Sequence, residues 1–210
     1  MKQLVLELSA PPAPSLQNFV VGRNAAVIAA LTALAEQPEA GAVIYIHGES
    51  GCGKTHLLNA LARHWDSAAT QIPCIVADDV HKQNDSQQIE LFDAFNRAKL
   101  NGGIILAAGD VAPLELKVRE DLRTRLGSGL VFQLHALSDT EKRDALRNHA
   151  QLRGLKLSDE VLNYVLTHLR RDMPTQMMVL DAIDHYSLMA KRPVTLPLVR
   201  EALQSLETPT

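Results

Sequence analysis

The 210-residue sequence lacks a surplus of basic residues, a cysteine framework and a long apolar run. Its formal net charge of −3 provides no driving force for non-specific binding to nucleic acid. Cys52 and Cys74 are the only cysteines, which excludes a disulfide framework and indicates a reducing compartment. No run reaches membrane-spanning length, and Met1-Lys2 is followed by a short apolar stretch and then prolines, so neither a membrane partner nor a signal peptide is expected. We therefore expect a cytoplasmic protein.

Two kinds of site chemistry also have no pattern in this sequence. The eight histidines show no spacing typical of metal ligands. No Ser/His/Asp or Cys/His arrangement for nucleophilic catalysis is apparent. The length and the hydrophobic fraction of 46% allow a sizeable core without disulfides or metal, in one domain or one domain with a small appendage.

The sequence does contain G-x-x-x-x-G-K-T at residues 48–55, a pattern typical of a phosphate-binding loop. A β-prone run at 43–46 precedes it and a helix-favouring run at 57–62 follows, which places the loop at a helix N-terminus. The glycines let successive backbone N–H groups point at phosphate oxygens. Lys54 would reach the β- and γ-phosphates, and the Thr55 hydroxyl would hold Mg²⁺. The predicted contacts to ADP or ATP are Gly48, Gly51, Cys52, Gly53, Lys54, Thr55 and His56.

Acidic residues follow two further apolar runs. Asp78-Asp79 closes the run 72–77, and we assign Asp78 to the metal and Asp79 to orienting the attacking water, from their order. Asp110 closes the run 104–108, where it could sense the γ-phosphate through water, because the carboxyl ends of parallel strands line the ligand crevice. The alternative for all three is an aspartate that serves a turn.

Four apolar runs favour strands, and the segments between them favour helices. The expected strands are 43–46, 72–77, 104–108 and 130–134. The expected helices are 24–37, the loop helix ending near 64–65, one capped by Asp85-Ser86 that runs to Lys99, and a charged helix at 115–126. Strands that alternate with helices predict a parallel sheet covered on both faces, and hence an α/β fold.

After Leu134 the sequence predicts helices only. A capping box at Ser138–Glu141 opens the first, and Ser158 and Thr195 cap two of the others. We predict a nucleotide-binding α/β domain at 15–136 and a four-helix domain at 137–210. Residues 1–14 form a peptide and a proline-rich tether, since Pro11, Pro12 and Pro14 exclude a helix there.

Three arginines in the segment 116–126 allow two interpretations. Arg119, Arg123 and Arg125 alternate with acidic residues, and the spacing alone favours a solvated face held by acid–base pairs. The functional alternative is that one of them is an arginine finger that acts on the nucleotide of a neighbouring molecule.

Taken together, these motifs resemble the AAA+ family, and within it the group of the bacterial replication initiator DnaA and its shorter relative Hda. The segment 19–24 resembles the adenine-contacting segment of this group, which implies contacts from Val20 and Val21. The segment 108–113 resembles its sensor 1, which implies that role for Asp110. The segment 121–126 followed by Gly129-Leu130 resembles its box VII, which places the arginine finger on Arg125. Residues 137–139, 153–154 and 180–181 match the lid of the shorter members.

The resemblance also extends to the N-terminus. Residues 3–8 are similar to the peptide with which such proteins bind the sliding clamp of DNA polymerase III, which implies partner contacts from Gln3, Leu4, Leu6 and Leu8. The alternative is an ordinary edge strand, because alternating leucines also favour strands. The chain ends at Thr210, with no helix-turn-helix domain for DNA after the lid, which favours the shorter members of the group.

The shorter members imply a mechanism. Such a protein, holding ADP and attached to clamp on DNA, docks on ATP-bound DnaA, and its box VII arginine stimulates hydrolysis there. DNA would then be contacted indirectly, through the clamp, and a homo-oligomer is possible. The alternatives are a free-standing ATPase or helicase loader of the same group, and a DNA-binding paralogue of the initiator.

Two departures from the group's pattern bear on hydrolysis and on DNA. The position of the sensor 2 arginine holds Pro174, so Arg171 or Arg170 would have to contact the phosphates instead. This predicts weak hydrolysis by the chain itself and makes a bound ADP state more plausible. The stretch before Asp78 is also short, which predicts a sheet that lacks one edge strand and the surface that the initiator uses on single-stranded DNA.

Overall fold

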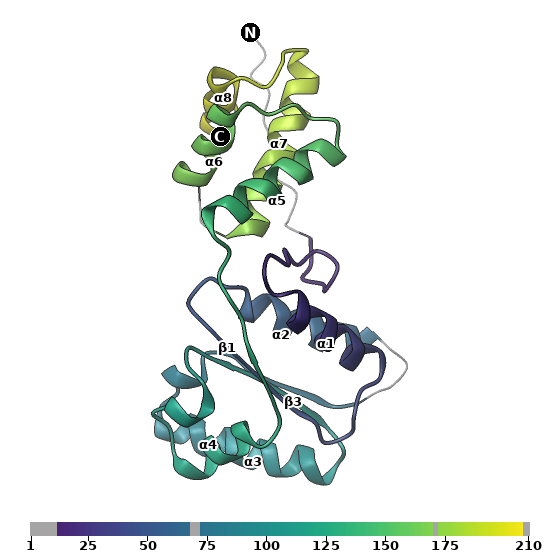
Figure 1. Ribbon diagram of the computed structural model, residues 1–210, viewed down its shortest axis with the longest axis vertical. Helices are drawn as coiled ribbons and strands as arrows, with labels where there is room; N and C mark the ends of the chain where they lie inside the picture. Colours follow the sequence, from purple (N-terminus) through teal and green to yellow (C-terminus); the bar gives the residue numbers. More distant parts are fainter. Residues whose placement is uncertain (1–11, 68–71, 170–171, 208–210) are drawn as a thin grey trace. The chain divides into compact units, whose positions relative to one another are not determined.

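The structure, a computed structural model, describes residues 12–67, 72–169 and 172–207 (Figure 1). The described residues separate into two compact units, one formed by Ala13–Ala136 and the other by residues 137–207. Within the described ranges, no helix is long and apolar enough to cross a membrane.

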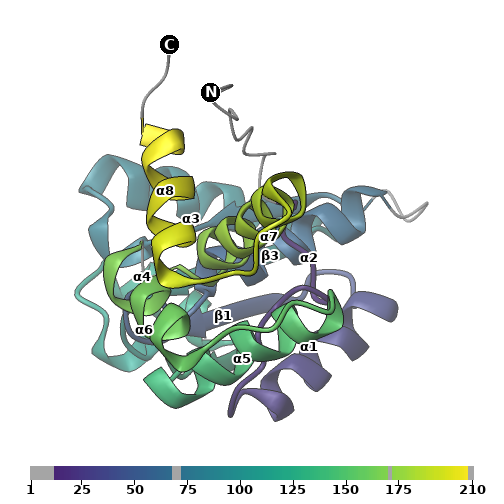
Figure 2. The same cartoon turned by 90° about the horizontal axis from the view of Figure 1, so that it is seen from above.

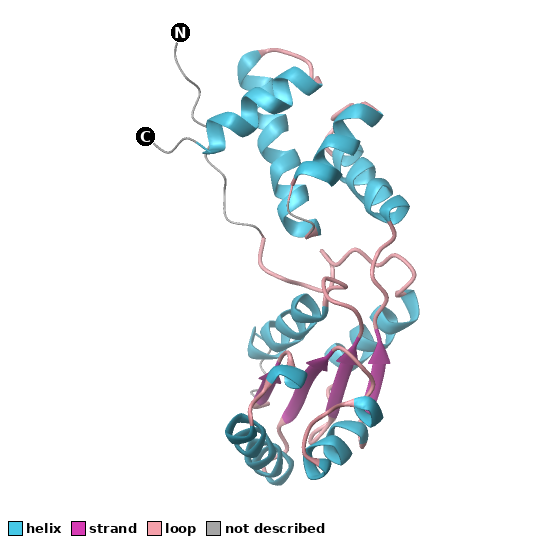
Figure 3. Ribbon diagram, turned by 90° about the vertical axis from the view of Figure 1, so that its left-hand side faces the viewer, coloured by secondary structure: helices cyan, strands magenta, loops and turns pink. Residues whose placement is uncertain are grey.

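The first unit is built on a parallel sheet of four strands in the order β2-β3-β1-β4 (Figure 3). The strands are β1 (Val43–His47), β2 (Cys74–Ala77), β3 (Ile104–Gly109) and β4 (Leu130–Gln133). Every residue of β3 is buried, because helices cover both faces of the sheet. The α/β fold with a parallel sheet is therefore confirmed.

Helices α1 (Ala25–Glu36) and α2 (Lys54–Ser67) pack on one face of this sheet, around Leu31, Ile46 and Leu57 (Figure 1). Helices α3 (Asp85–Leu100) and α4 (Glu120–Gly127) pack on the other, around Tyr45, Phe95 and Leu122. Adjacent residues of β1 enter different cores because successive side chains of a strand point to opposite faces. The sheet thus lies between two apolar layers, and the phosphate loop follows β1 at its carboxyl end.

Three local predictions in this unit are wrong at their boundaries. The helix expected from residue 115 begins at Glu120, and a short 3-10 turn, η2 (Pro113–Glu115), precedes it because Leu116 is extended. The cap of α3 is Asn84 rather than Asp85-Ser86: Asn84 Oδ1 accepts from Gln87 N at 3.0 Å, and Gln87 Oε1 accepts from Asn84 N at 2.9 Å. The second strand begins at Cys74 instead of residue 72.

Strand β2 lies at an edge of the sheet. Ile104 N donates to Pro73 O at 2.8 Å, so alternate residues of β2 turn their backbone groups toward β3 while Cys74 and Val76 turn theirs away. Within the described ranges no hydrogen bond satisfies those outward groups, and the Val76 side chain is 42% exposed. This arrangement agrees with the predicted loss of an outer strand.

The second unit contains the helices α5 (Asp139–Leu152), α6 (Asp159–His168), α7 (Met173–Ala190) and α8 (Leu196–Glu207) (Figure 2). The predicted capping box is present, since Ser138 Oγ accepts from Glu141 N at 3.2 Å and Glu141 Oε2 accepts from Ser138 N at 2.7 Å. The core of the unit consists of apolar side chains from all four helices, among them Leu146, Val161, Val165, Leu180, Ile183 and Val199. Asp181 accepts from Arg153 at 2.9 Å and pairs with His149 at 2.6 Å, which joins α5 to α7.

Candidate nucleotide-binding site

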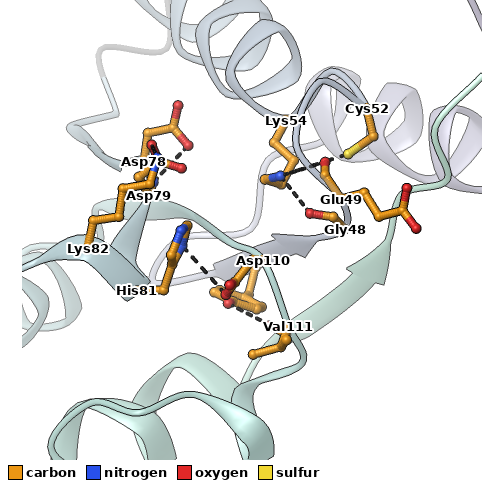
Figure 4. Close-up of polar contacts among 11 residues, drawn as sticks. Gly48, Glu49, Cys52, Lys54, Asp78, Asp79, His81, Lys82, Asp110 and Val111 are labelled. Atoms are coloured by element: carbon orange, nitrogen blue, oxygen red, sulfur yellow. Dashed lines mark hydrogen bonds and ion pairs between the residues drawn. The ribbon is translucent and has the colours of Figure 1, made fainter.

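The predicted phosphate loop connects β1 to α2, and α2 begins at Lys54 (Figure 4). The free N–H groups of a helix N-terminus therefore point into the loop, where they favour an anion. Gly53 has a φ of +104°, and a Cβ there would lie 2.6 Å from Phe19 Cε2. This φ favours glycine, and any other residue would also require the Phe19 ring, which lies against the loop backbone, to shift.

Lys54 is held inside the loop by the chain itself. Its side chain is buried, and Nζ donates to Gly48 O at 2.6 Å and to Glu49 O at 3.0 Å (Figure 4). Cys52 Sγ lies 3.9 Å from the same ammonium, and burial raises the pKa of the Cys52 thiol, which keeps it neutral. The loop thus contains one fixed positive charge of the kind that phosphate binding requires.

Thr55 and Asp78 meet at the ends of α2 and β2. Thr55 Oγ1 donates a hydrogen bond to Asp78 Oδ2. A hydroxyl and a carboxylate are oxygen ligands suited to Mg²⁺, which usually keeps several waters and takes the rest of its shell from phosphates. No cluster of three His, Cys, Asp or Glu that could hold a metal occurs within the part of the chain that the structure describes. The residues present therefore fit a magnesium ion that arrives with a nucleotide.

Asp79 makes a different set of contacts. Its backbone is left-handed, with φ of 48°, and its Oδ2 accepts from Lys82 Nζ at 2.6 Å. This hydrogen bond holds the pKa of Asp79 below its usual range. Figure 4 shows the Asp79 and Lys82 side chains meeting each other apart from Lys54. Asp79 is thus engaged by a neighbour on η1 (Val80–Lys82) instead of lying free beside the loop.

Asp110 follows β3 and faces a histidine that the sequence did not single out. Asp110 Oδ1 lies 3.6 Å from His81 Nδ1 (Figure 4). Tyr45 OH donates to Val111 O at 2.9 Å, and burial and the Asp110 charge raise the pKa of Tyr45, which keeps it a donor. Asp78, Asp79 and Asp110 thus follow two adjacent parallel strands, β2 and β3.

The expected base-contacting segment lies on the start of α2. The Phe19 ring lies 5.5 Å from the His56 ring, centroid to centroid, and His56 Nε2 is 2.9 Å from Ser15 O. The His56 side chain is therefore used to hold this segment. Val20 and Val21 follow it and remain partly exposed, which leaves them accessible to a ligand.

Asn24, the last residue of the segment 19–24, is a buried polar residue whose side chain is not among the predicted ligand contacts. It occupies the N-cap position of α1 but makes no side-chain capping bond. Instead Nδ2 donates to His135 O at 2.9 Å, and Oδ1 accepts from His135 N at 2.8 Å. The segment after the predicted base contacts is thereby tied to the end of the first unit.

Arg119, which precedes α4, and Arg123 and Arg125 within α4 differ in their partners. Arg119 pairs with Asp121 at 2.7 Å, and Arg123 lies 3.9 Å from Glu120. Arg125 has no carboxylate partner in residues 12–67, 72–169 and 172–207, and its guanidinium carbon lies 5.2 Å from the centroid of the Phe92 ring. The predicted finger is the one arginine of the three that is held by an aromatic ring.

Several predicted site residues lie outside the described residues. These are Gln3, Leu4, Leu6, Leu8 and Arg171, together with its neighbour Arg170. Pro174 is described and lies in the first turn of α7, where proline is tolerated.

A parallel sheet with a glycine-rich loop between β1 and α2, and with carboxylates after the next strands, defines a P-loop protein of the AAA+ class. A family model of the Hda lid domain matches residues 139–203, and a model of the bacterial DnaA ATPase domain matches residues 13–73. An uncharacterized protein of Haemophilus influenzae is 33% identical, over 96% of this chain and 98% of that protein.

The fold is similar to domain III of the replication initiation protein DnaA from Thermotoga maritima, with a TM-score of 0.68 at 21% identity over 97% of this chain and 100% of that chain. AMPPCP-bound DnaA from Aquifex aeolicus gives 0.61 at 22% identity over 88% of this chain and 70% of that chain. RuvB from Thermotoga maritima gives 0.60 at 15% identity, over 91% and 71%. The chain belongs to the DnaA/Hda family of AAA+ proteins and has an Hda-type lid domain.

Proposed function

We propose that this protein is an Hda-like regulator of replication initiation, which holds ADP or ATP with Mg²⁺ and supplies Arg125 to the ATP site of DnaA. The observation that carries the proposal is the difference among the arginines of α4. Arg119 and Arg123 are near acidic residues of their own segment, whereas Arg125 rests on Phe92. Replacing a cation–π contact by a contact to phosphate costs less free energy than replacing an ion pair does. Arg125 is therefore available to contact the nucleotide of a partner.

The phosphate loop supports the nucleotide part of the proposal. Lys54 would contact the β-phosphate and, in ATP, the γ-phosphate, while Thr55 and Asp78 would hold the metal. The bound Mg²⁺ would neutralise phosphate charge. Val20 and Val21 would contact the adenine, and DnaA from Aquifex aeolicus has been solved with AMPPCP.

Two features support weak hydrolysis by the chain itself. Asp79, the residue assigned to the attacking water, is engaged by Lys82. The sensor 2 position is Pro174, whose side chain has no donor for a phosphate oxygen. The nucleotide would therefore act as a structural element, and the accelerated reaction would occur in the partner, where a finger supplied in trans contributes roughly 10³–10⁵-fold.

The clamp attachment rests on sequence. Residues 3–8 offer an amide and alternating leucines to a groove, and the prolines at 11, 12 and 14 would keep this peptide away from the folded units. DNA would be reached through the clamp.

The test measures ATP hydrolysis by DnaA on clamp-loaded DNA, with and without this protein. We expect acceleration that requires the clamp, and the double substitution Leu6→Ala, Leu8→Ala should remove both clamp pull-down and the acceleration. Unchanged clamp binding by the double variant would contradict the tether. Rapid ATP turnover by the isolated protein would instead favour a free-standing ATPase or helicase loader, and tight salt-dependent duplex binding would favour an initiator paralogue.

A further inference from the structure

The segment Leu134–Ala136, which leads out of the first unit, is held from two sides by segments that adjoin the candidate nucleotide site. On one side is the start of α1, which follows the predicted base contacts Val20 and Val21. On the other is the start of the phosphate loop at Gly48. All of these residues belong to the first unit.

The contact on the base side is the Asn24 side chain. Asn24 is 2% exposed, and its amide exchanges two hydrogen bonds with the His135 backbone, at 2.9 and 2.8 Å. Asparagine is among the preferred N-cap residues, yet here the amide does not cap α1. The stabilisation that capping would provide is given up, and the side chain is used to hold His135.

The contact on the phosphate side is made by backbone. Leu134 N donates to His47 O at 2.7 Å, which extends the ladder beyond β4. A Cβ on Gly48 would lie 2.1 Å from Leu134 O, so the first glycine of the loop and the outgoing segment pack backbone against backbone. A displacement of the Gly48 backbone would therefore also displace the Leu134 backbone, and the reverse holds as well.

We propose that Asn24 is a positioning residue that couples occupancy of the nucleotide site to the segment leading into the helical lid. The proposal rests on the nucleotide binding argued under the proposed function, and it deepens that function by naming how a bound nucleotide acts as a switch. A purine against Val20–Val21 and phosphates on the loop restrain both supports of Leu134–Ala136. Binding therefore lowers the freedom of that segment, and the ligand favours the arrangement in which both supports are engaged.

The test is hydrogen–deuterium exchange of peptides covering residues 130–138, in the full chain, with and without ADP and Mg²⁺. In the wild type we expect ADP to slow exchange at His135 by about 10-fold or more, because its N–H is bonded to Asn24. Asn24→Ser is the informative variant. Serine is too short to bond both His135 groups, but it is a good N-cap and so compensates α1. We expect the effect of ADP on this segment to fall below about 2-fold in this variant, while ADP affinity measured by fluorescence titration changes by less than about 3-fold.

His135→Ala is the matched control. It removes a side chain at the same contact but keeps the backbone N–H and C=O that Asn24 uses, so it should behave as the wild type. An undiminished ADP effect in Asn24→Ser, or a loss in His135→Ala equal to that in Asn24→Ser, would overturn the coupling. If the wild type does not bind ADP, the proposed function fails together with this inference. If ADP protects the segment but DnaA hydrolysis is not accelerated, the coupling stands and the regulatory function fails.

Discussion

The phosphate loop and helix α4 each carry a cation to which we assign a role, and the contacts that hold the two cations differ. Lys54 is buried and bound to two carbonyls of its own loop. Arg125, in the last turn of α4, lies over an aromatic ring and is only partly buried. The difference agrees with our proposal that the loop holds a ligand of this chain, whereas Arg125 of α4 acts on another molecule.

The largest effect is expected when the Arg125 cation of α4 is removed. We expect Arg125→Ala to lower the stimulated rate of ATP hydrolysis by DnaA by about 10³-fold, because a finger supplied in trans stabilises the charge of the transition state. The measurement is phosphate release by DnaA on clamp-loaded DNA. Arg123→Ala, which removes a cation on the same helix that lies near Glu120, is the control and should cost little. Equal losses in the two variants would refute the distinction between these arginines.

Removing the Lys54 cation of the loop should lower the affinity for nucleotide. We expect Lys54→Ala to weaken nucleotide binding by about 100-fold, since the variant loses a charge-assisted contact to phosphate in a partly desolvated loop. Equilibrium titration with a fluorescent ADP analogue measures this loss. Lys82→Ala removes a nearby cation outside the loop and should leave the affinity nearly unchanged. A tight-binding Lys54→Ala variant would contradict the nucleotide site.

A smaller effect tests the metal pair. We expect Asp78→Asn to weaken ADP binding by about 10-fold when Mg²⁺ is present and to have little effect when the metal is chelated, because the carboxylate contributes through the metal. Titrations with Mg²⁺ and with EDTA, for both proteins, separate the two cases. The same loss in EDTA would assign Asp78 a structural role through Thr55 instead.

The smallest expected effect concerns the contact between Asp79 and Lys82. We expect Lys82→Gln to raise the pKa of Asp79 toward its usual value of about 3.9, because the hydrogen bond from Lys82 lowers it. The pair stabilises the fold above the unfolded pKa of the aspartate, and this contribution is lost as the pH falls through the lower folded pKa. The exposed pair should therefore change the unfolding midpoint only slightly at pH 7, and this change should disappear once the pH is below the folded pKa. An NMR titration of the Asp79 carboxyl checks the shift.

The fold was predictable because its signals are local. Continuous apolar runs marked the strands of a sheet buried on both faces, and the box at Ser138–Glu141 marked a helix start. The misplaced start of α4 is also physical: charged residues suit a helix and a loop equally, and the extended Leu116 is set by packing in the core under α3 and α4. Because Arg119 then becomes the residue before the helix, it can reach Asp121 two positions on, a pairing that helical spacing excludes.

The contacts within the candidate site were harder to predict from the sequence. The phosphate loop was recognisable from its glycines. The partner of Asn24, His135, lies 111 positions away, and no local pattern predicts that contact. The engagement of Asp79 by Lys82 depends on the left-handed backbone at Asp79, which the sequence does not announce for an aspartate.

The exposed edge of β2 bears on the tendency of the protein to aggregate in concentrated solution. Unpaired strand edges are templates for aggregation, and natural sheets protect them with short length, proline and charge. Four residues of strand span only about 13 Å. Two carboxylates, Asp78 and Asp79, stand directly after this strand and add charge at its carboxyl end. We therefore expect this edge to resist pairing with other copies, although no strand or helix of the described residues pairs with it.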